Sequence, residues 1–335
     1  MGDSDFKPGL YASEKNVLNG RRVSGFKMPK LFYLGLFAVF LLGIVSVNAQ
    51  NGVTEIDGCI IITDPGYYVI AGDISDPEIC ILISSNDVIL DGNGHWINQS
   101  SILLEGRSLS SAGVGINDVS ISQLTYGIKV GNVSNVTIKN VNLSGWDRGI
   151  YFENVSNSKI ENCTIIENGD GIYLNNSNYN IFSDNTIMNN GDDGIDFNDD
   201  NDHNTISGNM IMNNSDGIYF DDYNDYNTIS GNTIMNNDDG IDFDDYNDYN
   251  IFSDNTIMNN GDNGMEFDNG NSDNTISGNT ITGNGDKGIY IGSNNNNNTI
   301  LDNIIVDNTV AGIYLYDSSN NLIYNNYFNN TENVI

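Results

Sequence analysis

The tripeptide Gly-Ile-x recurs nine times along this chain at spacings of 22 to 24 residues, with a methionine replacing the isoleucine once. A repeat of this length is typical of a solenoid, in which each unit buries its apolar face only by stacking on its neighbours. Two asparagines, five residues apart, recur with the same period. The repeated glycines are Gly127, Gly149, Gly171, Gly194, Gly217, Gly240, Gly264, Gly288 and Gly312. The first asparagines are Asn135, Asn157, Asn180, Asn204, Asn227, Asn250, Asn274, Asn298 and Asn321, and the second are Asn140, Asn162, Asn185, Asn209, Asn232, Asn255, Asn279, Asn303 and Asn326.

One repeat, residues 227–243, indicates what each unit folds into. It contains three short segments in which apolar and polar residues alternate, separated by Asn, Gly or Asp. Alternation with a period of two indicates β-strands, and no stretch after residue 50 keeps a helical period. The sequence therefore predicts an all-β fold, a right-handed single-stranded parallel β-helix with three short strands per coil of 22–24 residues. The side chains expected to point inward are Ile229, Ile234, Ile241 and Phe243, and those expected to point outward are Thr228, Thr233, Met235 and Asp242.

The stacking of like residues explains most of the repeated positions. Coils about 4.8 Å apart align equivalent residues into columns along the helix axis. Asparagine is expected at the corners in the left-handed conformation, with its amide bonded to the coils on either side. The repeated glycine is expected to allow a positive φ just before a strand. Because a catalytic residue should interrupt such a pattern, no catalytic residue is predicted.

The net charge of −33 restricts the partners of this protein. Nucleic acids and anionic membrane surfaces are bound through Lys and Arg, of which the chain has 12 against 45 Asp and Glu. Neither is therefore predicted as a partner. High charge with low hydrophobicity is also typical of disorder, but the periodic apolar residues favour a folded chain.

The N-terminal region carries the pattern of a secretory signal. Leu31–Val47 is an apolar run of 17 residues, preceded by two lysines and followed by small residues up to Ala49. This predicts a signal peptide over residues 28–49 and a secreted, cell-surface or periplasmic protein with no membrane contact after cleavage. A short membrane anchor is the alternative, since 17 residues is the lower limit for a span. Residues 1–27 are interpreted as a polar preamble that comes from a mis-assigned start.

Export permits disulfides, and the chain has three cysteines, Cys59, Cys80 and Cys163. Cys59 and Cys80 flank one early segment, so a disulfide between them is one interpretation and two buried thiols are the other. The disulfide would close a loop of about 20 residues and stabilise the fold by about 3 kcal/mol. Cys163 is expected to be a small apolar core residue.

Acidic residues gather in the loop after each Gly-Ile-x-Phe and align from coil to coil. Stacked carboxylates about 4.8 Å apart repel each other by roughly 1 kcal/mol in water, so an intervening cation would stabilise them. Carboxylate and amide oxygens suit Ca²⁺, although the spacing does not match an EF-hand. The alternative is a solvated acidic surface suited to high salt. The candidate calcium ligands are Asp199, Asp202, Asp221, Asp222, Asp225, Asp244, Asp245, Asp248 and Asp268, and a further column on the other side of the glycine holds Asp170, Asp193, Asp216 and Asp239.

Two other columns are candidates for ligand binding. Tyrosines follow Gly-Ile at outward positions, interleaved with acidic residues, and such a face suits sugar rings and their hydroxyls, although Tyr is also a common exposed strand residue. Methionines share one outward register in four successive coils, and a column of thioethers can hold Cu(I). The alternative is that duplication of the segment Ile-Met-Asn-Asn produced the same column. The candidate carbohydrate contacts are Tyr151, Tyr173, Tyr219, Tyr290 and Tyr314; the candidate copper ligands are Met188, Met212, Met235 and Met258.

Two early segments carry a family resemblance. Residues 62–70, Ile-Thr-Asp-Pro-Gly-Tyr-Tyr-Val-Ile, and residues 86–97, Asn-Asp-Val-Ile-Leu-Asp-Gly-Asn-Gly-His-Trp-Ile, resemble the opening of NosD-like right-handed β-helix proteins. The Asn-Thr-Ile and Gly-Ile-Tyr coils that follow are similar to the same family, which is common among archaeal envelope proteins. The resemblance implies an N-terminal cap with the first coils over residues 50–104 and β-helix repeats over residues 105–335.

The functions implied by this resemblance are copper-site maturation and, among related pectate-lyase-like β-helices, sugar hydrolysis, elimination or epimerisation. The chain departs from the functional members in several ways. It has two histidines, His95 and His203, rather than a cluster, and no Lys or Arg between residues 160 and 286, where acids are densest. It also lacks the Gly-His-Gly and Arg-x-Lys elements of polygalacturonase-type sites.

The sequence therefore predicts a secreted or cell-surface structural or carbohydrate-interacting module, with a polysaccharide or cell-surface glycan as partner. The alternatives are a polysaccharide lyase or hydrolase and a NosD-type periplasmic copper-handling protein. Ten Asn-x-Ser/Thr sequons, Asn132 and Asn135 among them, are candidate glycosylation sites. No C-terminal cap is predicted after Asn326, which leaves an open strand edge and favours end-to-end association or a truncated longer protein.

Overall fold

The computed structural model describes residues 48–50, 52–76, 79–100 and 124–335. The expected preamble lies outside the described residues, as does all but the end of the expected signal peptide. The boundary expected between residues 104 and 105 also falls outside them. Across these described ranges, no helix is long and apolar enough to cross a membrane.

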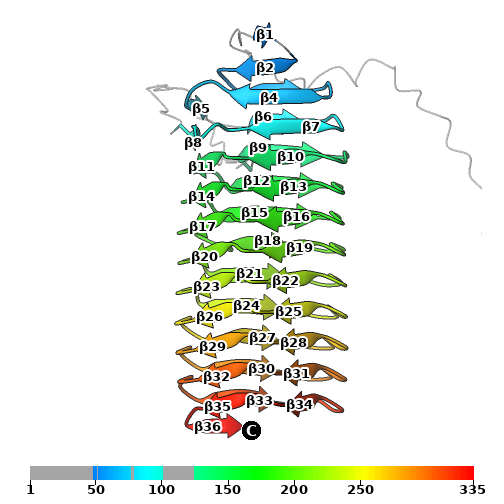
Figure 1. Ribbon diagram of the computed structural model, residues 1–335, viewed down its shortest axis with the longest axis vertical. Helices are drawn as coiled ribbons and strands as arrows, with labels where there is room; N and C mark the ends of the chain where they lie inside the picture. Colours follow the sequence, from blue (N-terminus) through cyan, green and yellow to red (C-terminus); the bar gives the residue numbers. More distant parts are fainter. Residues whose placement is uncertain (1–47, 51, 77–78, 101–123) are drawn as a thin grey trace, which may run out of the picture. The chain divides into compact units, whose positions relative to one another are not determined.

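Three sheets run along the axis of a β-helix of about 11 turns, in which the chain passes from sheet A to sheet C to sheet B in each coil (Figure 1). Sheet A contains β1 (Asn48–Gln50), β2 (Val53–Ile56), β4 (Gly66–Ile70), β7 (Val88–Asp91), β10 (Thr137–Lys139), β13 (Lys159–Glu161), β16 (Ile181–Ser183), β19 (Thr205–Ser207), β22 (Thr228–Ser230), β25 (Ile251–Ser253), β28 (Thr275–Ser277), β31 (Thr299–Leu301) and β34 (Leu322–Tyr324). Sheet C contains β5 (Ile74–Asp76), β8 (Trp96–Gln99), β11 (Asn142–Ser144), β14 (Thr164–Ile166), β17 (Thr186–Met188), β20 (Met210–Met212), β23 (Thr233–Met235), β26 (Thr256–Met258), β29 (Thr280–Thr282), β32 (Ile304–Val306) and β35 (Tyr327–Asn329). Sheet B contains β3 (Ile60–Ile62), β6 (Ile79–Ile83), β9 (Tyr126–Gly131), β12 (Arg148–Glu153), β15 (Asp170–Asn175), β18 (Ile195–Phe197), β21 (Asp216–Phe220), β24 (Asp239–Phe243), β27 (Met265–Phe267), β30 (Lys287–Ile291), β33 (Ala311–Leu315) and β36 (Glu332–Val334).

Neighbouring strands of all three sheets pair in parallel, except that β1 pairs with β2 antiparallel. The predicted fold class, an all-β right-handed parallel β-helix, is therefore confirmed. The four residues expected to point inward in the 227–243 repeat are fully buried. The core is a set of stacked columns, in which the rings of Phe197, Phe220 and Phe243 lie 4.2–4.4 Å apart.

Buried asparagines connect successive coils in four ladders rather than the two that the repeat predicts. In each ladder the side-chain oxygen of one Asn accepts a hydrogen bond from the backbone amide of the preceding coil's Asn, as Asn232 does from Asn209 at 2.9 Å. The predicted ladders hold from Asn180 and Asn185 onward. The two further ladders run through Asn168, Asn190, Asn214, Asn237, Asn260, Asn284 and Asn308, and through Asn201, Asn224, Asn247, Asn271 and Asn295.

The expected left-handed conformation of the ladder asparagines is wrong from Asn180 onward, because the residue before each ladder position has the positive φ. Asn135 and Asn157 do have a positive φ, but they are exposed and stand one position before the ladder. In their coils, the ladder position is occupied by Val136 and Ser158 instead. The hydroxyl oxygen of Ser158 accepts a hydrogen bond from the backbone amide of Val136. The ladder asparagines thus serve as hydrogen-bonding groups, while their neighbours make the corners.

The repeated glycines also have a different role from the one predicted. None of them has a positive φ. At Gly240, an added Cβ would lie 2.4 Å from the carbonyl oxygen of Gly264 and 2.6 Å from the Cγ2 atom of Ile257. Glycine is therefore required because successive coils approach too closely for any side chain.

The N-terminal coils contain a disulfide between Cys59 and Cys80. Cys163 is free and buried in the core. At the other end, the side chains of β36 are exposed, and so are Leu322 and Tyr327 on β34 and β35. β34, β35 and β36 are the last strands of their sheets.

Candidate functional site

The outer surface of sheet B carries two outward columns of aromatic and charged side chains, which we call the sheet B face. One column precedes the repeated glycines and consists of Tyr126, Arg148, Asp170, Asp193, Asp216, Asp239, Asn263 and Lys287. The other follows Gly-Ile and consists of Lys129, Tyr151, Tyr173, Asp196, Tyr219, Asp242, Glu266, Tyr290 and Tyr314. All five predicted tyrosines belong to the second column. The structure therefore brings them together with the acidic column that precedes the glycines.

Burial of the carboxylates weakens their ionisation across the centre of this face. Desolvation, followed by repulsion from neighbouring acids, raises the pKa of Asp242 to about 9 and that of Asp196 to about 8. The same causes raise the pKa of Asp193 and Glu266 to about 7. Asp242 and Asp196 therefore carry a proton at neutral pH and can donate as well as accept hydrogen bonds, whereas Asp193 and Glu266 change protonation there.

The contacts within the face leave one buried acceptor free. The Tyr219 hydroxyl donates to Asp244 at 2.5 Å, and the Asn263 amide donates to Glu266 at 2.5 Å. In the part of the chain that the structure describes, no group hydrogen-bonds to the buried Oδ1 atom of Asp242. A buried polar atom without a partner is costly to the fold.

Arginine and lysine stand at the first coils of the face. The Arg148 Nε atom lies 3.3 Å from Asp170, and its guanidinium lies 3.2 Å from the centre of the Tyr173 ring. Lys129 pairs with Glu153 at 2.9 Å and lies over the Tyr151 ring, so Tyr151 is buried rather than exposed. Arg148 was not predicted as a site residue, because it precedes residues 160–286, the acid-rich stretch that lacks Lys and Arg. The signal was present, since Arg148 precedes Gly149 as Asp170 precedes Gly171.

The predicted calcium ligands lie in the corner between sheets B and A. Asp202 and Asp225 form a ladder of their own there, in which each carboxylate accepts from the backbone amide of the next coil's Asp, at 2.9 Å for Asp225 and 2.7 Å for Asp248. Two groups of three carboxylates bring their oxygens within 4.8 Å of one another. They are Asp199, Asp221 and Asp222 in this corner and Asp170, Asp193 and Asp196 on the sheet B face. Calcium binding stays a prediction.

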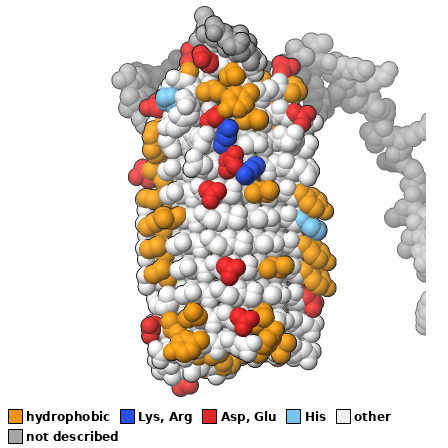
Figure 2. All heavy atoms as spheres, in the orientation of Figure 1, with side chains coloured by type: hydrophobic (Ala, Val, Ile, Leu, Met, Phe, Trp, Pro, Cys, Tyr) orange, Lys and Arg blue, Asp and Glu red, His pale blue; other side chains and the backbone are white. Residues whose placement is uncertain are grey.

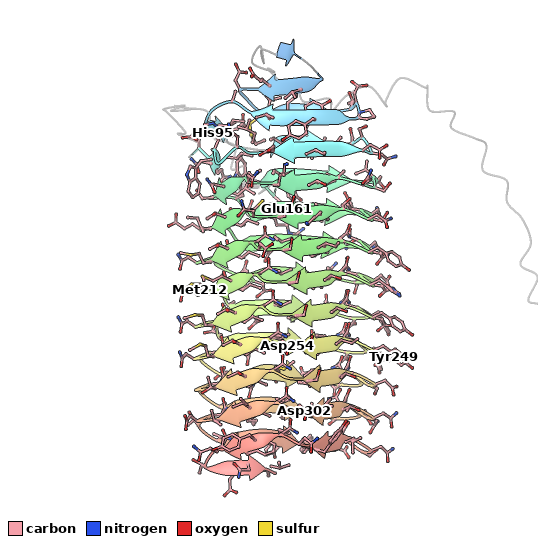
Figure 3. The ribbon with its side chains drawn as sticks, in the orientation of Figure 1. His95, Glu161, Met212, Tyr249, Asp254 and Asp302 are labelled. Carbon is pink, nitrogen blue, oxygen red and sulfur yellow. A yellow bond between two sulfur atoms is a disulfide. The ribbon has the colours of Figure 1, made fainter. Side chains whose placement is uncertain are left out.

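The predicted copper ligands lie on the outer surface of sheet C. Met188, Met212, Met235 and Met258 pair in register in four successive coils. In Figure 3, Met212 points outward on the left edge and Tyr249 on the right edge of the column. Copper binding also stays a prediction.

Comparison with known proteins places this chain in a family. The family model described as a right-handed β-helix region matches residues 100–249, 148–303 and 224–335. These matches overlap and cover more than half of the chain, so the chain belongs to this family. A search of curated protein sequences found no match.

Several solved structures share the fold at low sequence identity. A point mutant of the periplasmic alginate epimerase AlgG is 14% identical, with a TM-score of 0.65, over 84% of this chain and 79% of the epimerase. The A-module of the Azotobacter vinelandii mannuronan C-5 epimerase AlgE4 is 16% identical, with a TM-score of 0.65, over 85% and 87% of the two chains. The Dettilon tailspike protein is 19% identical, with a TM-score of 0.60, over 82% of this chain and 61% of the tailspike. The fold is thus shared with carbohydrate-active enzymes and a tailspike.

Proposed function

We propose that the sheet B face binds a polysaccharide whose chain runs along the helix axis. The observation that carries this proposal is the second column of the face, where tyrosines and carboxyl groups follow one another over successive coils in the order Tyr173, Asp196, Tyr219, Asp242, Glu266, Tyr290 and Tyr314. Aromatic rings give a sugar an apolar contact with little entropy cost, and carboxyl groups hydrogen-bond its hydroxyls. The fold shared with carbohydrate-active enzymes supports the same proposal.

The electrostatics favour a neutral polysaccharide. Residues 160–286 contain no Lys or Arg, so most of the face offers a polyanion no cationic side chain to pair with. A neutral chain would instead supply hydroxyls, which both donate hydrogen bonds to the carboxyl groups of this face and accept hydrogen bonds from them.

The test is titration of the full chain with neutral and anionic polysaccharides. Tyr219→Ala should weaken binding roughly tenfold, corresponding to about 1.4 kcal/mol. Met212→Ala, an outward residue on sheet C, is the matched control and should bind as the parent does. Binding of no polysaccharide, or an equal loss in both variants, would contradict the proposal.

A second candidate activity of the same face is cleavage of the bound chain. The group of Asp170, Asp193 and Asp196 favours it, because burial raises the pKa of Asp196 to about 8, whereas Arg148 pairs with Asp170 and partly offsets the rise that burial causes in the pKa of Asp170. A protonated carboxyl beside an ionised one is the arrangement of a general acid and base in glycoside hydrolysis. Release of reducing ends or of unsaturated sugars would establish a hydrolase or a lyase, and Asp196→Asn should abolish it. No release from any polysaccharide would leave a binding module.

We propose that the protein is exported. The disulfide between Cys59 and Cys80 supports this, since disulfides persist in oxidising compartments. Intact-mass measurement of protein from its native host should find Gln50 at the mature N-terminus. Retention of residues 31–47 would favour the anchor.

The copper-handling alternative rests on the NosD-like resemblance and the methionine column, and metal analysis of the purified protein with added Cu(I) tests it.

A further inference from the structure

Six exposed aromatic residues form a ridge along the corner between sheets B and A. Tyr179, His203, Tyr226 and Tyr249 stack in four successive coils with ring centres 4.7–5.0 Å apart. Tyr223 and Tyr246 form a second stack beside them, with centres 5.5 Å apart. The tyrosines are 46–55% exposed. We call these six residues the aromatic corner. Figure 2 shows hydrophobic side chains gathered in a band at each of the left and right edges of the column, and Figure 3 places Tyr249 on the right edge.

The fold does not require aromatic residues at these positions. All six have a positive φ, a conformation that Asn, Asp and Gly adopt most readily. Other coils use those residues at the two equivalent corner positions. The first position holds Asn132, Asn154, Asn176, Asp200, Tyr223, Tyr246, Gly270, Asn294 and Asp317, and the second holds Asn135, Asn157, Tyr179, His203, Tyr226, Tyr249, Asp273, Asn297 and Asn320.

The aromatic corner carries carboxylates as well as aromatic rings. Each stretch 221–227 and 244–250 reads Asp-Asp-Tyr-Asn-Asp-Tyr-Asn, so an aspartate directly precedes each of the four tyrosines in these stretches. No Lys or Arg lies between Lys159 and Lys287 to compensate them. The ring faces are covered by stacking, which leaves ring edges, hydroxyls and carboxylates at the surface. The uncompensated carboxylates disfavour a second copy of this acidic chain and favour a cationic partner.

We propose that the aromatic corner docks a Lys/Arg-rich segment of another protein. Charge complementarity supports this partner, and the chain itself shows the contact. Arg148 pairs with Asp170 while lying over Tyr173, and Lys287 pairs with Asp286 while lying 5.3 Å from the Tyr290 ring centre. Cationic side chains in this protein thus contact a carboxylate and a tyrosine together. This surface is separate from the polysaccharide site proposed on the sheet B face.

The test measures binding of a fluorescent oligoarginine peptide to the full chain at physiological salt, with an oligoglutamate peptide as the negative probe. The variant replaces Tyr223, Tyr226, Tyr246 and Tyr249 by Asn, which keeps the charge and suits the positive φ. We expect its Kd to rise at least tenfold while its melting temperature stays equal or rises. Tyr316→Asn with Tyr327→Asn, two exposed tyrosines elsewhere, should bind as the parent does.

Equal binding by the parent and the four-site variant would overturn the proposal, because net charge alone would then account for affinity. Failure of the parent to bind the peptide would overturn it as well. A photo-crosslinking oligoarginine peptide tests the parent without any substitution. Its crosslinks should fall within residues 221–227 and 244–250, and crosslinks confined to the sheet B face would contradict the proposal. Polysaccharide binding by the four-site variant, measured alongside, separates this outcome from the proposed function.

Discussion

The backbone amide of Asn209 donates to the side-chain oxygen of Asn232 in the next coil, and the side-chain amide of Asn232 donates back to the backbone carbonyl of Ile206, at 2.9 Å each. Both contacts are buried. Each such Asn therefore joins its own coil to the coil before it. Because these hydrogen bonds are buried, water cannot replace them, and they help to hold the stack of coils together.

Asn232→Ala should destabilise the fold by roughly 2–4 kcal/mol, because it removes the acceptor of the buried Asn209 backbone amide and one donor to the Ile206 carbonyl. Chemical denaturation measures this. Asn236→Gly is the control, since Asn236 is an exposed corner residue with a φ of 58° that glycine adopts freely. A loss below about 0.5 kcal/mol for Asn232→Ala would show that the ladder does not hold the coils together.

Gly240→Ala should cost at least about 3 kcal/mol, because the added methyl meets the Gly264 carbonyl oxygen at 2.4 Å and cannot move away. Gly191→Ala is the matched control, since its nearest contact would be an ordinary 3.7 Å from the Asn168 carbonyl oxygen. Thermal unfolding of the two variants compares them. Equal melting temperatures would contradict the close approach of the coils at Gly240.

The sheet B face should make stability fall as pH rises. The folded state raises the pKa of Asp196 to about 8 and that of Asp242 to about 9, whereas an unfolded Asp titrates near 3.8. Between these values the folded state binds more protons, so stability is fully present below pH 3.8 and is lost as pH rises through 8 to 9. Melting temperatures across that range should therefore decline, and Asp242→Asn should flatten the decline and stabilise the fold at pH 8 by on the order of 1 kcal/mol. An unchanged slope in the variant would remove Asp242 as the cause.

Calcium is expected to stabilise the corner between sheets B and A more than simple screening does. Oxygens of Asp199, Asp221 and Asp222 lie within 4.8 Å of one another, as ligands of one ion would. A ligand that binds only the folded state adds about 2.7 kcal/mol at one hundred times its Kd. Thermal unfolding in CaCl₂ and in NaCl of equal ionic strength compares the two effects, with Asp222→Asn as the variant that should lose the difference. Equal shifts in both salts would leave a solvated acidic surface.

The fold could be predicted from the sequence because the inward residues repeat with a strict spacing. Ile229, Ile234 and Ile241 alternate with polar residues in each strand, and the repeat of this pattern every 22–24 residues is what a stack of parallel coils buries. The register of the asparagine ladder was harder to predict. Asn157 and Asn180 occupy equivalent positions in the sequence repeat, but only Asn180 is buried in the ladder. A one-residue offset at a corner exchanges a buried position for an exposed one.

The site was predicted less completely than the fold. The tyrosine column could be read from Gly-Ile-Tyr, but its burial against Lys129 and Arg148 depends on contacts between coils. The role of Gly240 could not be predicted either, since sequence alone does not separate a positive φ from a close approach of two backbones. Both depend on what lies one coil away, about 23 residues along the chain.

The most direct test of the polysaccharide site is carboxyl footprinting of the full chain with and without a bound neutral polysaccharide, read by mass spectrometry. The account predicts that modification of Asp242 and Glu266 on the sheet B face falls when the polysaccharide is present. Asp254 and Asp302, which Figure 3 labels after β25 and β31, should be modified equally in both conditions. Unchanged modification of Asp242 and Glu266, or protection at Asp254 and Asp302 instead, would contradict the sheet B face as the binding site.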